Sequence, residues 1–299
     1  MEFITGGLAG VGATIITNPI DIVKTRLQLQ GELRAKSEHT ARYRGILHAL
    51  YVIARTDGAF ALQKGLCPAI VQGFTINSVR LGIYHIAEVQ GWIHNEKGEI
   101  SIGKAAFWAS VSGYTGAVVG TPVSVIKTRM QAAAHPSIAV GRQHKYNGML
   151  HGFKTIYKTE GIKGYFAGMN AISTRIAIGS GAQLTTFSAA KEWLVTHGGF
   201  ENQPPIIVAF VASLISGAIV VSIETPLDLA NTRLFNQGSA ATQGALLYTG
   251  IFDCLRKTYK IEGLRGLYKG VWPLYIRMAP FTTVSLLLWD ILNNMLVEK

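Results

Sequence analysis

Long apolar stretches alternate with polar, basic stretches along the whole chain. A helix needs about 20 apolar residues to cross a bilayer. Six stretches reach about that length, namely residues 3–29, 67–93, 104–132, 169–195, 205–235 and 271–296. Longer polar links alternate with shorter ones, and each longer link contains a short helical pattern. The pattern predicts an all-α membrane protein with six transmembrane helices and a short surface helix in each longer link.

One motif returns three times at the end of an apolar stretch. Its first copy reads Pro19-Ile20-Asp21-Ile22-Val23-Lys24-Thr25-Arg26, and the other copies begin at Pro122 and Pro226. Proline inside a helix removes a hydrogen bond and bends the helix. The second proline follows the first by 103 residues, and the third follows by 104. Even spacing indicates a three-fold internal repeat, with repeats 1–97, 98–200 and 201–299 in one domain, 1–299.

Composition supports a membrane protein and narrows its chemistry. Only 15% of the residues are charged, and mean hydropathy is +0.26. The net charge of +11 lies in the polar links, as in loops on the positive side of a membrane, and not on a nucleic-acid-binding face. Cys67 and Cys254 are too few for a disulfide framework, and the His residues lack zinc spacing. We expect no nucleic acid, metal, cofactor or enzyme activity.

A spacing that is repeated in the three links also places glycines at helix starts. Each link has a Tyr-x-Gly sequence, then an acid followed by glycine, then a glycine just before the next apolar stretch. Backbone N–H groups at helix starts bind phosphate, and basic membrane-side pockets suit cardiolipin. Formation of a turn would explain the same glycines. The candidate lipid contacts are Gly45, Gly65, Gly148, Gly168, Gly250 and Gly270.

These motifs, repeated in phase across the chain, resemble the mitochondrial carrier family (solute carrier family 25), and within it the oxaloacetate/dicarboxylate branch. The resemblance implies a monomeric six-helix bundle with pseudo-three-fold symmetry in the mitochondrial inner membrane. It also implies surface helices on the matrix side, bound cardiolipin, and transport of small solutes by alternating access. No basic, Ser-rich transit peptide precedes the first apolar stretch, so any targeting signal is expected to be internal.

In the family, the motif acid of one repeat pairs with the motif base of the next repeat to form a matrix gate. Here the expected pairs are Asp21 with Lys127, Asp228 with Lys24, and Ser124 with Asn231. The opposite sense would pair Lys127 with Asp228, Asp21 with Asn231, and Ser124 with Lys24. We prefer the first sense because it leaves no buried charge without a partner. The alternative is that these residues cap helix ends and snorkel.

Two further sets of residues complete the expected gates. Gln28 and Gln131 lie one turn beyond the gate lysines and are candidate braces, as in the family. On the opposite side, the family's aromatic-acid-x-x-base network is degenerate in this chain. Lys191 with Asp290 is the obvious remaining pair there, and we expect it to form the cytoplasmic gate.

Each even-numbered apolar stretch contains one arginine, which is costly in a membrane and so indicates function. Arg175 and Arg277 lie seven residues after Gly168 and Gly270, and Gln72 holds the same position after Gly65. These three residues should therefore lie at one depth around one cavity, with Arg80 about 12 Å further along its helix. Two guanidinium groups can clamp two carboxylates, or a carboxylate and a sulfate.

The alternative is that these arginines neutralise Glu88 or Glu224. Glu224, two residues before Pro226, could couple a proton or merely pair with an arginine. The resemblance implies that arginine on the fourth helix accompanies keto acids or amino acids rather than nucleotides. The expected function is antiport of small dicarboxylates or keto acids such as oxaloacetate, with sulfate a further candidate. A proton-leak carrier of the uncoupling type and a non-transporting membrane adaptor are the alternatives.

Overall fold

The computed structural model describes residues 2–33, 42–95, 101–200, 203–238, 246–277, 280–281, 284 and 288. This part of the chain is mostly helical, as the sequence predicts. Its elements are α1 (Glu2–Leu29), α2 (Ile46–Thr56), the 3-10 helix η1 (Ala59–Gln63), α3 (Leu66–Val89), α4 (Ile102–Ala132), α5 (Met149–Tyr165), α6 (Met169–Thr196), α7 (Pro205–Gln237) and α9 (Ile251–Leu267). Residues 271–277 begin a further helix.

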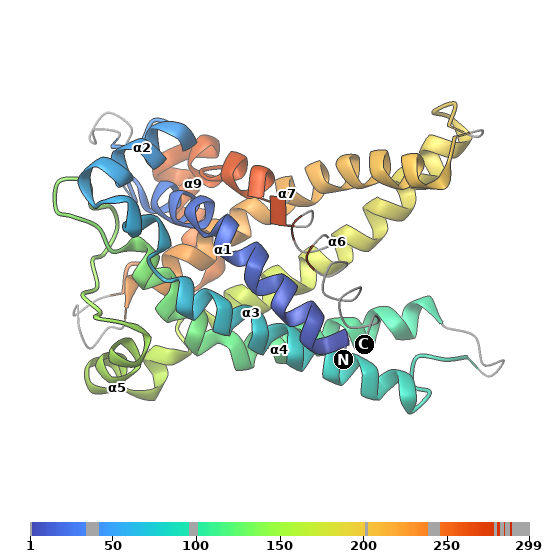
Figure 1. The fold of residues 1–299 in the computed structure, drawn as a ribbon, viewed down its shortest axis with the longest axis horizontal. Coiled ribbons are helices and arrows are strands. Elements are labelled where there is room, and N and C mark those ends of the chain that lie inside the picture. Colours follow the sequence, from blue (N-terminus) through green and yellow to red (C-terminus); the bar gives the residue numbers. More distant parts are fainter. Residues whose placement is uncertain are drawn as a thin grey trace.

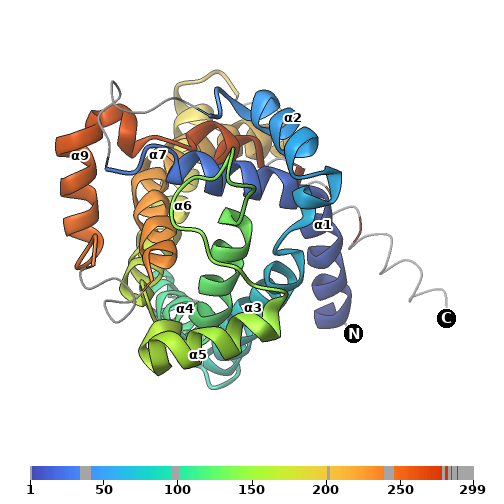
Figure 2. The same cartoon turned by 90° about the vertical axis from the view of Figure 1, so that its left-hand side faces the viewer.

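The long helices form a bundle whose two ends differ. Helix α3 packs along α4, α6 packs along α7, and α1 contacts α3, α4 and α7. The short helices α2, α5 and α9 surround the ends of α1, α4 and α7 at one end of the bundle (Figure 2). At the other end α6 and α7 diverge from α3 and α4 (Figure 1). We call the first of these the surface-helix end.

The motif prolines lie inside the three helices that meet at the surface-helix end. Pro19 is in α1, Pro122 in α4 and Pro226 in α7, and each helix continues past its proline. The gate residues of the motif therefore lie on the last turns of these helices. The bend that we expect at each proline stays a prediction.

In every repeat, the glycine that follows the acid of the polar link turns the chain. Gly58 (φ 88°, ψ 158°) separates α2 from η1, while Gly161 (φ 68°) and Gly263 (φ 70°) interrupt α5 and α9. Residues with a side chain rarely adopt such positive φ values, so glycine is favoured at all three positions. The turn directs the chain from the surface helix into the next long helix.

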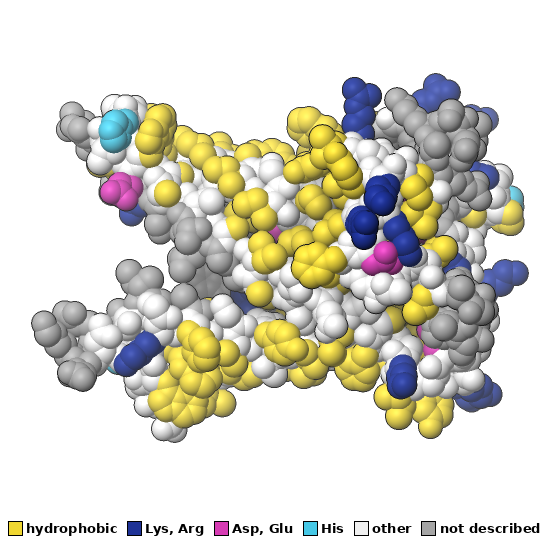
Figure 3. Space-filling model, turned by 180° about the vertical axis from the view of Figure 1, so that it is seen from behind, with side chains coloured by type: hydrophobic (Ala, Val, Ile, Leu, Met, Phe, Trp, Pro, Cys, Tyr) yellow, Lys and Arg dark blue, Asp and Glu magenta, His cyan; other side chains and the backbone are white. Residues whose placement is uncertain are grey.

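Apolar side chains cover the outer face of the bundle. Large exposed examples are Phe74, Phe107, Tyr114, Phe210 and Trp272, and Figure 3 shows such side chains along the bundle, with Lys and Arg gathered mainly at the surface-helix end. Among the described helices, one segment, Phe210–Gln237, is long and apolar enough to cross a membrane by length and composition alone, so the arrangement of six spans stays a prediction.

Candidate gate and substrate site

Two ion pairs join α1 to the other proline-containing helices. Lys24 Nζ lies 2.8 Å from Asp228 Oδ2, and Lys127 Nζ lies 3.2 Å from Asp21 Oδ2. Both carboxylates are buried. The pairs therefore have the sense that we prefer from the sequence, because this sense gives each buried charge a partner of opposite sign.

The third expected contact of the ring, between Ser124 and Asn231, is not formed. The Ser124 hydroxyl accepts a hydrogen bond from Gln72 Nε2 (2.6 Å) and donates one to the Gly120 carbonyl (2.8 Å). Asn231 is buried, and its Oδ1 has no hydrogen-bond partner. The prediction was wrong because a serine side chain is short, so nearer groups on α3 and on its own helix satisfy it.

The two candidate braces differ in what they contact. Gln28 Nε2 donates to Asp228 Oδ2 (2.8 Å), and its Oε1 accepts a hydrogen bond from Thr232 (2.7 Å). Gln28 therefore holds the carboxylate that Lys24 also contacts. Gln131 instead accepts from Thr25 (3.1 Å) and donates to Asn18 Oδ1 (3.2 Å). It links α4 to α1 without a hydrogen bond to either ion pair.

Two candidate substrate arginines lie beside the gate aspartates Asp21 and Asp228. Arg175 is on α6, and Arg277 is on the helix that begins at residue 271. Arg277 Nε lies 3.2 Å from Asp21 Oδ1, and Arg175 Nε lies 3.9 Å from Asp228 Oδ1. Each aspartate therefore lies between a lysine from one neighbouring repeat and an arginine from the other. Gln72, which holds the equivalent position in the first repeat, contacts Ser124. In all three repeats this position therefore contacts the acid position of the motif in the following repeat, although the residue types differ.

A cavity of about 240 Å³ lies between α3, α4, α6 and α7. Its lining residues are Gln72, Ile76, Arg80, Gly113, Ile172, Arg175, Ile176, Gly179 and Glu224. Arg175 Nη1 donates to Glu224 Oε2 across 3.0 Å. The space-filling view is hollowed at the end where α6 and α7 diverge from α3 and α4 (Figure 3).

The expectation that Gln72, Arg175 and Arg277 surround this one cavity needs correction. Gln72 and Arg175 line it together with Arg80, whereas Arg277 is not among its lining residues. Arg277 is held instead by Asp21 and lies over the ring of Phe281, 5.8 Å from its centroid. The attraction of a buried carboxylate for a guanidinium accounts for this position.

Comparison with other proteins shows which family this chain belongs to. The sequence profile described as "Mitochondrial carrier protein" matches residues 1–90, 98–198 and 202–299. This chain belongs to the mitochondrial carrier family. The resemblance read from the motifs is therefore confirmed, and the chain is a member of a family of transporters.

Named relatives of this carrier match it over nearly its full length. Solute carrier family 25 member 35 of Mus musculus is 41% identical over 98% of this chain and 98% of its own length. The mitochondrial oxaloacetate transport protein of Saccharomyces cerevisiae is 37% identical over 95% of this chain and 86% of its own. The mitochondrial citrate transporter E of Aspergillus niger is 36% identical, with 98% and 93% covered.

Sequence reasoning missed three buried arginines in this carrier. The last base of each motif is fully buried and pairs with the acid that precedes the turn glycine of its own repeat. The pairs are Arg26 with Asp57 (2.9 Å), Arg129 with Glu160 (2.6 Å) and Arg233 with Glu262 (2.7 Å). The signal was present, because both residues of every pair recur in phase in the three repeats.

The same arginines also bind the next repeat. Their Nε groups donate to backbone carbonyls near the ends of α1, α4 and α7. In each case the acceptor belongs to the following repeat. The acceptors are Gln131 for Arg26 (3.3 Å), Phe235 for Arg129 (3.0 Å) and Gln28 for Arg233 (3.2 Å). Each arginine thus joins its own surface helix to the neighbouring repeat, which holds the ends of α1, α4 and α7 together.

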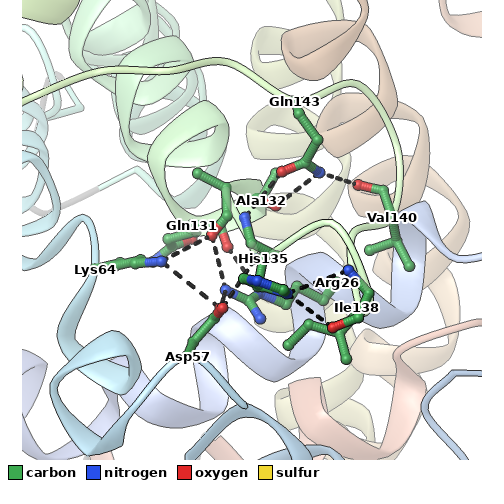
Figure 4. Close-up of polar contacts among 12 residues, drawn as sticks. Arg26, Asp57, Lys64, Gln131, Ala132, His135, Ile138, Val140 and Gln143 are labelled. Carbon is green, nitrogen blue, oxygen red and sulfur yellow. Dashed lines mark hydrogen bonds and ion pairs between the residues drawn. The ribbon is translucent and has the colours of Figure 1, made fainter.

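Figure 4 shows Arg26 and Asp57 covered by the loop that follows α4. Asp57 accepts hydrogen bonds from Arg26 Nη2 (2.9 Å) and the His135 backbone N–H (2.8 Å). Burial raises the pKa of Asp57, but the His135 hydrogen bond and the Arg26 guanidinium outweigh it, so the pKa lies below its ordinary value. Asp57 is therefore charged at neutral pH.

The same loop also contacts the third repeat. His144 Nε2 lies 2.9 Å from the Asn236 carbonyl, and Arg142 Nη1 donates to the Gln237 carbonyl (2.8 Å). Burial, and the nearby Arg129 guanidinium, lower the pKa of His144 to about 3. A neutral His144 then donates its Nε2 proton to the Asn236 carbonyl, and the loop spans all three repeats.

The remaining positions expected from the carrier family are placed as follows. Lys191 is exposed on α6, and Asp290 lies outside the described residues. Gly45, Gly148 and Gly250 precede α2, α5 and α9. A Cβ at the second set of glycines would meet the following repeat: Gln131 Cγ at 3.1 Å from Gly65, Phe235 Cδ1 at 2.8 Å from Gly168, and Gln28 Cγ at 3.0 Å from Gly270. Close packing is thus one use of these three glycines.

Within the described residues, no group of three or more His, Cys, Asp or Glu side chains could hold a metal ion.

Proposed function

We propose that this carrier exchanges small dicarboxylates or keto acids, such as oxaloacetate, across the mitochondrial inner membrane, with sulfate as a further candidate. The protein acts as a monomer with six membrane-spanning helices: α1, α3, α4, α6, α7 and the helix that begins at residue 271. Helices α2, α5 and α9 lie on the matrix side. The names of the yeast and fungal relatives, which refer to oxaloacetate and citrate, support this class of substrate.

The observation that carries the proposal is the position of the candidate substrate arginines beside the gate aspartates. Arg277 lies 3.2 Å from Asp21 and Arg175 lies 3.9 Å from Asp228. An anion that draws these guanidinium groups toward itself withdraws them from the aspartates. Substrate binding then changes the ring that holds the helix ends together, and only such a difference between states can shift a conformational equilibrium.

In this account the cavity is open toward the intermembrane space and the matrix gate is closed. The anion enters between Arg80 and Arg175, with Gln72 at the base and Arg277 recruited from Asp21. Two ion pairs close the matrix gate, with Gln28 and Gln131 bracing the helix ends. The third position, Ser124 and Asn231, carries no ion pair, so this gate opens at a lower cost than one with three pairs. Lys191 and Asp290 form the gate on the opposite side.

Cardiolipin is the proposed lipid ligand. Gly45, Gly148 and Gly250 lie at the starts of the surface helices, and a Cβ at Gly45 or Gly148 would meet no atom within 4 Å. Gly65 and Gly168 lie at the starts of α3 and α6, and Gly270 lies at the start of the helix that begins at residue 271. The N–H groups at these helix starts suit the phosphates of the lipid headgroup.

The experiment is exchange in liposomes that contain the purified carrier. We expect external labelled oxaloacetate to exchange with internal oxaloacetate, with sulfate and citrate tested as competitors and ATP as a nucleotide control. Exchange of ATP at a rate equal to that of oxaloacetate would contradict an anion site built for small carboxylates. Proton conductance without a transported anion would favour an uncoupling carrier, and no transport of any anion would favour an adaptor.

A further inference from the structure

Glu224 on α7 lies in the wall of the cavity. The exchange of anions alone does not explain why a carboxylate is placed there. Glu224 Oε2 accepts a hydrogen bond from Arg175 Nη1 (3.0 Å), and both residues line the cavity. The equivalent residues of the other repeats, Thr17 and Gly120, carry no charge. An acid at this depth is therefore specific to the third repeat.

Gly179 on α6 makes room for this carboxylate. A Cβ at Gly179 would lie 1.9 Å from Glu224 Oε1 and 2.9 Å from its Cδ, which is far closer than atoms that are not bonded can approach. Arg175 lies four residues before Gly179, on the same face of α6. One turn of α6 thus offers a notch for the carboxylate together with a guanidinium to bind it.

Five other charged groups lie on helices that pack against α7 or border the cavity and the gate, and four of them have ion-pair partners elsewhere. They are Lys24 on α1, Lys127 on α4, Glu262 on α9, Arg80 on α3 and Arg277 on the helix that begins at residue 271. Lys24 pairs with Asp228, Lys127 and Arg277 with Asp21, and Glu262 with Arg233. Arg80 faces the cavity with Arg175 and Glu224. The charged residues that line the cavity thus carry one net positive charge.

We propose that Glu224 competes with the transported anion for Arg175 and takes up one proton when the anion binds, so that each anion crosses with a proton. This inference rests on the proposed function. An ionised Glu224 and a substrate carboxylate repel each other when both lie at one guanidinium. A proton on Glu224 removes the repulsion and frees Arg175 Nη1 for the substrate. The protonated carboxyl can also donate a hydrogen bond to the anion.

The cycle is balanced in protons. The proton comes from the compartment from which the anion enters and binds to a carboxylate oxygen of Glu224. When the anion leaves on the other side, the Arg175 guanidinium becomes free again. Glu224 then releases the proton into that compartment and returns to Arg175. The carrier reorients either with an internal anion and a proton, which is exchange, or empty, which leaves one anion and one proton transported in net terms. Two cavity arginines and a neutral Glu224 together match the two charges of a dicarboxylate or a sulfate ion.

Sulfate is the probe that tests this inference in liposomes, because sulfate carries no proton of its own near neutral pH. The carrier is reconstituted with the membrane potential held at zero by potassium and valinomycin, and the outside is made more acidic than the inside. We expect wild-type carrier to accumulate sulfate by up to roughly tenfold per pH unit of gradient. A dye inside the liposomes should report about one proton for each sulfate ion.

The decisive variant is Glu224→Gln, with Glu192→Gln, an exposed position on α6, as its matched control. We expect Glu224→Gln to exchange sulfate for sulfate without a pH gradient but to lose accumulation and proton uptake, while Glu192→Gln behaves as wild type. Accumulation retained in Glu224→Gln would overturn the inference. So would wild-type exchange that ignores the gradient. Wild-type carrier that exchanges neither sulfate nor oxaloacetate would refute the proposed function itself, and this inference with it.

A second variant keeps the test decisive if Glu224→Gln does not assemble. Gly179→Ala displaces the carboxylate from its notch without removing it, and we expect it to lower the ratio of protons to sulfate. The matched control is Gly217→Ala on α7, where an added Cβ meets no atom within 4 Å. An unchanged proton ratio in Gly179→Ala would contradict the role of Glu224.

Discussion

Lys24 Nζ on α1 lies 2.8 Å from Asp228 Oδ2 on α7, although 204 residues separate the two in sequence. The corresponding contact between Lys127 and Asp21 joins α4 to α1. Helix α1 therefore holds both other helices of the ring through ion pairs. Between α4 and α7 the ring has no such pair, because Ser124 and Asn231 stand where the other repeats supply charges.

Replacing Asp228 by asparagine should destabilise the carrier strongly. The substitution leaves Lys24 as an unpaired and largely buried charge, which costs about 3 kcal/mol or more. Thermal unfolding of the purified protein in detergent measures the loss. The matched control is Asp253→Asn, because Asp253 forms an ion pair of the same 2.8 Å length with Lys257 on the exposed face of α9. That exposed pair is worth about 1 kcal/mol or less, so equal losses would count against a buried gate pair.

Adding the missing charges should strengthen the ring. The double variant Ser124→Asp with Asn231→Lys supplies an acid and a base at the position that lacks an ion pair. We expect it to melt at a higher temperature than either single variant and to exchange oxaloacetate more slowly, because a third pair must break when the gate opens. Each single variant introduces one buried charge and should be less stable than wild type. Additive effects of the two substitutions would show that the positions do not interact.

The buried arginines should contribute more to stability than to transport chemistry. Glu160→Gln removes the carboxylate that receives two hydrogen bonds from Arg129, at 2.6 and 2.9 Å. The guanidinium, which has no exposed surface, then lacks its counter-charge, and we expect a loss of about 3–5 kcal/mol. Thermal unfolding measures this loss, and Glu192→Gln on the exposed end of α6 serves as control. A change within about 0.5 kcal/mol for Glu160→Gln would be incompatible with the described contact.

Stability should fall as the pH drops below the ordinary pKa of histidine. His144 has a pKa of about 3 in the folded protein and 6.5 without the protein environment. Below pH 6.5 the unfolded chain binds a proton that the folded chain excludes, so acid favours unfolding. Between pH 6.5 and about pH 5 the loss should approach about 2 kcal/mol.

His144→Gln isolates this effect, because glutamine can donate to the Asn236 carbonyl and does not titrate. Thermal unfolding across this pH range should show a smaller slope for the variant than for wild type. His151→Gln, at an exposed position on α5, should leave the slope unchanged. Identical slopes in wild type and His144→Gln would exclude a buried, neutral His144.

The sequence predicted the ion pairs of the gate better than it predicted its neutral contacts, and the reason is physical. Lys24 and Lys127 each require a buried acid, and only one pairing sense satisfies every charge. The Ser124 hydroxyl has no such requirement, because a carbonyl of its own helix and the Gln72 amide serve equally well. Its partner therefore depends on distances that a linear sequence does not contain.

The position of Arg277 illustrates a second limit. Counting from the motif glycines correctly gave Arg175 and Arg277 equivalent positions, and both lie beside a gate aspartate. The count could not show that Asp21 draws Arg277 out of the cavity wall while Glu224 retains Arg175 in it. Such competition among nearby acids depends on three-dimensional distances of a few ångströms. The same holds for Arg26, Arg129 and Arg233, whose backbone acceptors belong to other repeats.

The most direct test of the account is oxaloacetate exchange in liposomes by Arg175→Ala and Arg277→Ala. Each substitution removes a guanidinium that we place on the transported anion and beside a gate aspartate. Loss of a buried charge partner typically costs 2–5 kcal/mol, so we expect each exchange rate to fall by at least about 30-fold at low substrate concentration. Arg55→Ala on the exposed face of α2 should exchange as wild type. Oxaloacetate exchange within about twofold of wild type in both Arg175→Ala and Arg277→Ala would contradict the account.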